Sequence, residues 1–92
     1  MAIADARHIL VDNENLCKEL VKALSNGADF STLAKDNSLC PSKAKGGDLG
    51  TFSPGKMVKA FDDVVFSADI GVIYGPVKTE FGYHLIEVTY RG

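Results

Sequence analysis

The sequence predicts an α+β domain in which helices wrap a small, four-stranded, mostly antiparallel sheet. The chain has 92 residues, so we expect a single domain over residues 1–92. Apolar residues follow strand-like and helix-like spacings in the order β-α-α-β-α-β-β. The last two predicted strands are joined by a tight turn, which a parallel pair cannot have, so the sheet cannot be all parallel.

The first half of the chain predicts one strand and two helices. The segment "ARHILV" at 6–11 is apolar and β-rich, which indicates a buried strand. A helix is expected over 12–27, because its apolar residues fall on one face and Gly27 suits a helix end. A shorter helix is expected over 29–38, with Asp29 as its N-cap.

The second half begins with a loop and ends with two strands. Residues 39–56 hold two Pro and four Gly, so we expect a loop with a short edge strand at 48–52. A helix is predicted over 57–68, and strands over 71–77 and 83–90. The positions expected to form the inner face of that helix are Met57, Ala60, Phe61, Val64 and Val65.

Composition excludes several classes of partner. The net charge is −2, with 10 basic and 12 acidic residues well mixed, so neither a nucleic-acid stripe nor a polybasic membrane patch is expected. No segment approaches the ~20 apolar residues of a membrane span. The N-terminal residues are too few and too polar for a signal peptide, so we expect a cytoplasmic protein. We also expect a monomer. Cys17 and Cys40 would then be reduced, and they form no zinc-ligand spacing.

The protein has two histidines, His8 and His84, and both lie on predicted apolar strands. A single histidine on such a strand is most often a core residue whose hydrogen bonds are satisfied. If the first and last strands are neighbours, however, the two rings can hydrogen-bond to each other, because a neutral imidazole has one donor and one acceptor. Such a pair would fix two polar rings inside the core.

Cys40 lies on the Gly-rich loop near Lys43 and Lys45, whose charges would favour a thiolate. A Cys-His hydrolase is therefore one interpretation, although no third orienting residue is evident. A small, half-buried hydrophobic residue is the commoner role. Cys17 lies on the inner face of the first helix and is expected in the core.

Two other patterns allow a structural and a functional interpretation. The segment "KGGDLG" lacks the order of a phosphate-binding loop, so turn formation explains its glycines better. Met57 and Phe61 are spaced by one helical turn, which usually indicates core, but together they can line an adaptable apolar pocket.

Taken together, three segments resemble the parvulin peptidyl-prolyl cis/trans isomerases, most closely the minimal single-domain bacterial members. These segments are "ARHILV", "GADFSTLAKDNSLCPSKAKGGDLGTFSPGKMVKAFDDVVFS" and "GPVKTEFGYHLIEV". The resemblance covers essentially the whole chain in order. It implies the parvulin (FKBP-like) fold, a four-stranded, mostly antiparallel sheet wrapped by helices, which agrees with the pattern of elements above.

The resemblance also implies roles for individual residues. His8 and His84 match the paired histidines behind the active site, and Thr79 matches a hydroxyl bonded to them. Cys40 matches a position that is Cys or Asp in the family. Lys59 stands where many relatives have Pro at a helix start, which makes the start of that helix less certain. The residues that match the pocket for the proline ring are Leu49, Met57 and Phe61, and Phe81 matches the residue beside that pocket.

The resemblance implies an isomerase that accelerates rotation about X-Pro bonds in protein folding, without a covalent intermediate, metal or cofactor. Its expected partners are proline-containing peptides and unfolded or nascent proteins. The segment after the first strand, "VDNENL", carries Asp12 and Glu14 and no Lys or Arg, so we expect no dependence on substrate phosphate. An alternative is a chaperone-like module that binds extended, proline-containing segments without significant catalysis.

Overall fold

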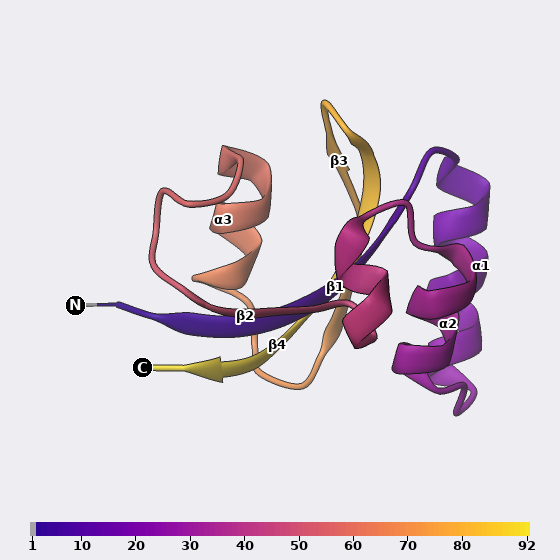
Figure 1. Cartoon of the computed structure of the whole chain (residues 1–92), viewed down its shortest axis with the longest axis horizontal. Coiled ribbons are helices and arrows are strands. Elements are labelled where there is room, and N and C mark those ends of the chain that lie inside the picture. The colour runs from indigo at the N-terminus through magenta and orange to yellow at the C-terminus, as the bar shows by residue number, and fades with distance from the viewer. Residues whose placement is uncertain (1) are drawn as a thin grey trace.

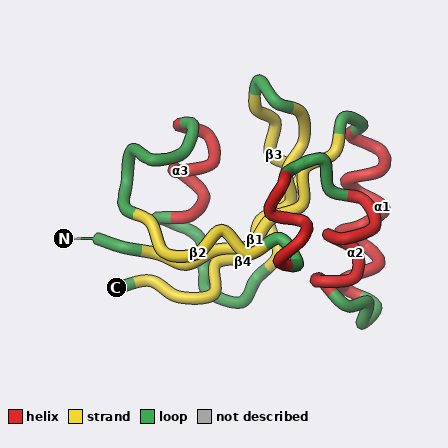
Figure 2. The backbone as a smooth tube through the Cα atoms, in the orientation of Figure 1, coloured by secondary structure: helices red, strands yellow, loops and turns green. Residues whose placement is uncertain are grey.

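The computed structural model describes residues 2–92 and has the predicted order of elements (Figures 1 and 2). A short 3₁₀ helix, η1, is added within the predicted loop. The elements are β1 (Ala4–Val11), α1 (Glu14–Ser25), α2 (Phe30–Asn37), η1 (Pro41–Lys45), β2 (Asp48–Phe52), α3 (Lys59–Val65), β3 (Ile73–Thr79) and β4 (Gly82–Arg91).

The four strands form one sheet in the order β2-β1-β4-β3, and every neighbouring pair is antiparallel. The first and last strands of the chain are therefore central neighbours, as the histidine argument required. The predicted strand at 48–52 is confirmed and lies at one edge of the sheet.

Alternation along the two central strands creates two cores. In β1, Ala4 and Ala6 pack toward α3, whereas Ile9 and Val11 pack toward α1 and α2. In β4, Ile86 and Leu85 divide in the same way between the two cores. Figure 1 shows this arrangement, with α3 at one end of the sheet and α1 and α2 at the other. Other polar residues of the central strands, such as Asp5, Arg7 and Glu87, are only partly buried, so the almost fully buried His8 and His84 are conspicuous.

Side chains cap the starts of the first two helices, and the predicted N-cap Asp29 is confirmed. The Asn13 side chain accepts a hydrogen bond from the Leu16 amide at 3.0 Å, and the Asp29 side chain accepts one from Thr32 at 2.9 Å. On α1, Cys17 is fully buried, which confirms its predicted place in the core.

The predicted helix over 57–68 is too long at both ends. Helix α3 begins at Lys59 and ends at Val65, so Met57 lies in the preceding loop. Ala60 lies within the helix but is exposed, so its predicted place on the inner face is wrong. The apolar spacing misled because Met57, in the loop before the helix, lines the same cavity as Phe61 and so places an apolar residue at helical spacing outside the helix. At the other end, Arg91 donates hydrogen bonds from Nη1 to the carbonyl oxygens of Val65 and Ala68, at 3.2 and 2.5 Å. These bonds satisfy carbonyl groups where the helix stops.

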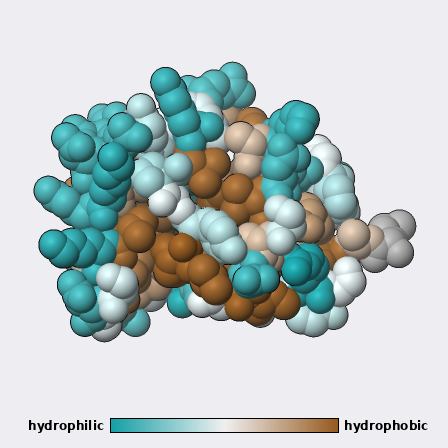
Figure 3. Space-filling model, turned by 180° about the vertical axis from the view of Figure 1, so that it is seen from behind, coloured by the Kyte–Doolittle hydropathy of each residue, from teal (hydrophilic) through white to brown (hydrophobic). Residues whose placement is uncertain are grey.

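The described residues show three further features. The face turned away from the viewer in Figure 1 exposes apolar side chains across its middle and lower edge (Figure 3). None of the helices within residues 2–92 has both the length and the apolar character needed to cross a membrane. The same residues contain no group of three or more His, Cys, Asp or Glu side chains placed to hold a metal ion.

Candidate active site

An apolar cavity of about 320 Å³ opens on the α3 side of the sheet. Its walls come from β1, the segment before and into η1, β2, the loop before α3, α3 itself, the β3–β4 turn and β4. The lining residues are His8, Leu10, Leu39, Cys40, Pro41, Leu49, Met57, Val58, Phe61, Phe81 and His84. The structure thus brings seven of the eight predicted site residues to one cavity, and the eighth, Thr79, contacts it indirectly.

Sheet register places the two histidines side by side at the cavity floor. Leu10 pairs with His84 and His8 pairs with Ile86, so the histidines are diagonal neighbours on the same face. Their Nδ1 atoms lie 3.0 Å apart, and their rings are nearly parallel, at an angle of 18°. Both are almost fully buried, with 5% and 4% of their surface exposed.

Phe61 completes the floor. Its ring meets both imidazoles nearly at right angles, with centroid distances of 5.4 Å to His8 and 5.5 Å to His84. Such edge-to-face contacts are favourable between flat rings and fix their relative orientation. The floor is therefore made of three rings that hold one another in place.

The hydrogen-bond chain continues from His84 to the β3–β4 turn. His84 Nε2 lies 2.7 Å from Thr79 Oγ1, and the Phe81 amide donates to the same oxygen at 3.2 Å. This chain links the polar network behind the cavity to Phe81, whose side chain is 61% exposed at the cavity mouth. The predicted contact between Thr79 and the histidines is confirmed in geometry.

Both histidines are neutral near pH 7. Burial, and then the neighbouring His84, lower the pKa of His8 from 6.5 to about 4, and burial lowers the pKa of His84. One proton shared between the two Nδ1 atoms satisfies that contact, whereas protonating both rings would place two N–H groups against each other. The pair does not satisfy itself completely, however, because His8 Nε2 has no hydrogen-bond partner among residues 2–92.

Cys40 lies in the cavity wall, half-buried, immediately before η1. Within the described part of the chain, no hydrogen bond joins its sulfur to either imidazole, and the Nδ1 atoms of both rings are used by each other. The arrangement required of a Cys-His nucleophile, a thiol bonded to its base, is therefore not formed. Lys43 and Lys45 are both exposed on η1 and do not line the cavity.

Sequence analysis missed Ser38, a buried residue that positions the Cys40 wall. Its hydroxyl oxygen accepts hydrogen bonds from the amides of Leu10, at 3.1 Å, and Cys40, at 3.3 Å. The Leu39 amide also donates to the Leu10 carbonyl at 2.8 Å. Ser38 thus attaches the wall to the part of β1 that β2 does not cover. A serine at a helix end is too common for its sequence to have revealed this role.

Four cavity residues were also missed: Leu10, Leu39, Pro41 and Val58. Leu39 offered a signal, because it is a large apolar residue beside Cys40 in a segment rich in Gly and Pro. It is 59% exposed, although its backbone is bonded to β1. An apolar residue held in the open at the edge of a cavity indicates a binding surface.

Comparison with known proteins decides the family. The model of the PpiC-type peptidyl-prolyl isomerase (PPIase) domain matches residues 2–91, nearly the whole chain. This chain belongs to the PpiC-type PPIase domains. The match confirms the resemblance to parvulins. Within this PPIase domain, the predicted residues form the three-ring floor and much of the apolar cavity.

Relatives of this PPIase domain include longer proteins and one of its own size. The foldase protein PrsA of Geobacillus kaustophilus is 51% identical over 85 residues, which cover 91% of this chain and 30% of PrsA. The structure of the peptidylprolyl isomerase PrsA from Bacillus anthracis has a TM-score of 0.96 at 43% identity, covering 99% of this chain and 42% of that one. NmPin, the parvulin of Nitrosopumilus maritimus, has a TM-score of 0.86 at 37% identity and matches 96% of both chains.

These likenesses confirm the predicted parvulin fold. They also show that the chain spans less than a third of the length of the PrsA foldase it matches. The extent of the domain over residues 1–92 and the role of each site residue stay predictions.

Proposed function

We propose that this PPIase domain accelerates cis/trans rotation about X-Pro bonds in unfolded polypeptides, without a covalent intermediate. The observation that carries the proposal is the apolar cavity closed by Phe61 and the buried, hydrogen-bonded pair His8 and His84. Rotation of an amide has a barrier of roughly 18–20 kcal/mol, set by resonance, and X-Pro bonds populate both isomers. Catalysis therefore requires stabilising the twisted amide, and no bond to carbon needs to form.

The cavity suits a proline ring in size and character. Its volume of about 320 Å³ lies at the small end of ligand pockets, and Leu49, Met57 and Phe61 supply apolar walls. The planar amide is more dipolar than the twisted amide, because resonance separates its charge. A site poor in water therefore disfavours the planar form relative to the twisted one.

Fixed dipoles near the rotating carbonyl would supply the remaining stabilisation. Cys40 lies in the wall, and the His8–His84 pair forms part of the floor, where neutral rings shape the site without attacking the substrate. The neutrality of the pair supports this role, because two cations under an apolar cavity would draw water into it.

We propose further that the domain does not select phosphorylated substrates. The cavity lining includes no Lys or Arg, and the segment between β1 and α1 carries Asp12 and Glu14. Recognition of a phosphate normally needs Arg or Lys, whereas nearby carboxylates repel it. Exposed Leu39 and Phe81 at the cavity mouth favour an uncharged, apolar residue before proline.

The experiment compares kcat/KM for matched Leu-Pro, Ser-Pro and phospho-Ser-Pro peptides, together with refolding of a protein limited by a slow X-Pro step. We expect catalysis of all three peptides, with Leu-Pro the best. A tenfold preference for the phosphopeptide, about 1.4 kcal/mol, would contradict phosphate independence and indicate Lys43 and Lys45 as the phosphate contacts.

A chaperone-like binding module is the second candidate, because the exposed Leu39 and Phe81 would also hold an extended chain. Peptide binding without any acceleration of proline-limited refolding would favour it over the isomerase. The substrates we propose in either case are proline-containing segments of unfolded or nascent proteins, as the foldase relatives suggest. A monomeric state and a cytoplasmic location stay predictions.

A further inference from the structure

The loop between β2 and α3 forms part of the cavity wall. It runs from residue 53 to residue 58, and its last two residues, Met57 and Val58, line the cavity. Inside the loop, the Lys56 amide donates to the Ser53 carbonyl at a long 3.4 Å. This single weak bond does not fix the position of Met57 over the cavity.

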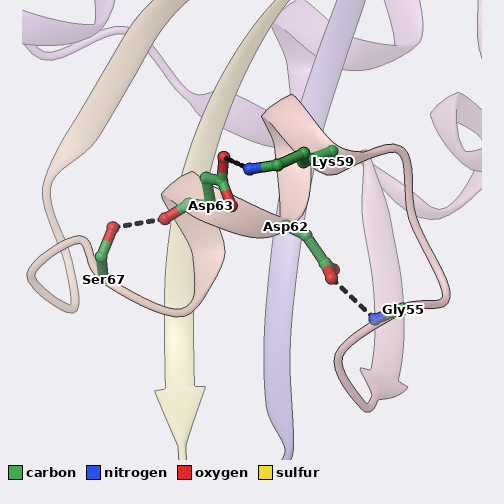
Figure 4. Close-up of polar contacts among 5 residues, drawn as sticks. All are labelled: Gly55, Lys59, Asp62, Asp63 and Ser67. Carbon is green, nitrogen blue, oxygen red and sulfur yellow. Dashed lines mark hydrogen bonds and ion pairs between the residues drawn. The ribbon is translucent and has the colours of Figure 1, made fainter.

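A side chain of α3 supplies the missing attachment. Asp62 Oδ2 accepts a hydrogen bond from the Gly55 amide at 2.6 Å, across the space between helix and loop (Figure 4). Hydrogen bonds to a carboxylate are about twice as strong as those between neutral groups. Gly55 has a φ of +91°, which only glycine adopts readily, and this backbone conformation is part of the turn that presents the amide to Asp62.

Asp62 follows Phe61 directly on α3, so the bond joins the loop wall to the helix that supports the cavity floor. Its other oxygen, Oδ1, is buried and has no hydrogen-bond partner among residues 2–92. A buried carboxylate oxygen without a donor is unfavourable for stability. Stability alone therefore does not explain why a carboxylate occupies this position.

We propose that Asp62 is a positioning residue, which holds the 53–58 loop and thereby Met57 against the cavity and sets the affinity for the proline ring. It acts through the loop and does not contact the substrate. Because Met57 closes on the ring in both isomers, the interaction strengthens ground-state and transition-state binding alike. Loss of Asp62 should then raise KM and leave kcat nearly unchanged.

The neighbouring Asp63 provides a matched control. It has the same charge and lies on the same helix, but its carboxylate pairs with the exposed Lys59 at 2.9 Å. Its carbonyl oxygen accepts a hydrogen bond from the Ser67 hydroxyl, and neither of these two partners belongs to the 53–58 loop (Figure 4). Replacing Asp63 changes the charge of α3 without detaching the wall.

The test compares wild-type protein with Asp62→Ala, Asp62→Asn and Asp63→Asn. Peptide dissociation constants, KM and kcat are measured for one Leu-Pro peptide, and NMR follows the Gly55 amide. We expect Asp62→Ala to weaken peptide binding and raise KM about fivefold to tenfold, with an upfield shift and faster hydrogen exchange of the Gly55 amide. Asp62→Asn keeps an acceptor oxygen and should lose about twofold, whereas Asp63→Asn should match wild type.

Three results would overturn the proposal: unchanged peptide affinity in folded Asp62→Ala, an equal loss in Asp63→Asn, or a fall in kcat without a rise in KM. If Asp62→Ala does not fold, the measurements on Asp62→Asn decide the question. Peptide affinity equal to that of wild type, together with an unshifted Gly55 amide signal in Asp62→Asn, would then refute the attachment. The inference about Asp62 rests on the proposed function of the cavity, but the binding assay tests the role of Asp62 separately from isomerase activity. A wild-type protein that binds the peptide without isomerising it would contradict the isomerase, while weaker binding by Asp62→Ala would still support the attachment.

Discussion

Mild acid should destabilise this protein through the buried pair His8 and His84. In the folded state, burial and then the proximity of His84 lower the pKa of His8 from 6.5 to about 4, and burial also lowers the pKa of His84. In the unfolded chain both rings regain an ordinary pKa of about 6.5. Between about pH 6.5 and pH 4 the unfolded state therefore binds protons that the folded state does not, so the free energy of unfolding falls as the pH falls.

The size of the effect follows from the two pKa values of His8. A pKa of about 4 in the folded state and 6.5 in the unfolded state removes about 2 kcal/mol of stability between pH 7 and pH 5. His84 adds a loss in the same direction. Carboxyl groups with ordinary pKa values of about 4 remain mostly ionised at pH 5, so this interval isolates the histidines. Against a total stability of roughly 5–15 kcal/mol, such a loss is readily measured.

The assay is urea unfolding at pH 7, 6 and 5 for wild-type protein and His8→Gln. Glutamine does not titrate, so the variant should lose about 2 kcal/mol less than wild type over this interval. Histidine NMR titration of the folded protein provides an independent measurement, in which the His8 ring should stay neutral down to about pH 5. A His8 signal that titrates near 6.5 in the folded state, with equal pH dependence in both proteins, would refute the buried neutral pair.

Three substitutions test other parts of the site. Cys40→Asp should retain substantial isomerase activity, because twisting an amide needs no nucleophile; complete loss in a folded variant, or an acyl adduct trapped on Cys40, would contradict the non-covalent mechanism. His84→Ala should lower stability by about 1–3 kcal/mol, since it leaves His8 Nδ1 unpaired, and an unchanged melting temperature would show that no buried network exists. Ser38→Ala should cost about 1–3 kcal/mol in urea unfolding, because the Leu10 and Cys40 amides lose their acceptor, and wild-type stability would argue against that attachment.

The sequence predicted the fold well where periodicity and capping are local. The strands, the first two helices and the N-cap Asp29 follow from short-range patterns and agree with the structure. The error in α3 has a tertiary cause. Met57 has helical spacing relative to Phe61, but it lies in a loop that Asp62 ties back to the helix. A contact across seven residues is not visible in a periodic pattern.

The site residues named from the sequence came from unusual residue types and from the resemblance to parvulins, and the structure brings seven of the eight to one cavity, whereas ordinary residues outside the resemblance were missed. A histidine in an apolar strand stands out, and so does a cysteine in a Gly-rich loop. Ser38 and Asp62 do not, because serine and aspartate are common near helix ends, and their roles depend on distant backbone amides. The residues that hold the cavity walls in place therefore needed the structure, whereas most of the residues that line the cavity did not.

The position of the histidine pair depends on sheet register as much as on residue type. His8 and Ile9 are consecutive on β1, yet His8 lines the cavity and Ile9 packs in the core beside α1 and α2. A slip of one residue between β1 and β4 would send each side chain of the slipped strand to the opposite face and separate His8 from His84. The two cores disfavour such a slip, because in β1 it would carry the charged Asp5 and Arg7 onto the face that packs toward α3. The two hydrophobic cores thus fix the geometry of the polar pair, and the sheet that stabilises the domain also aligns its active site.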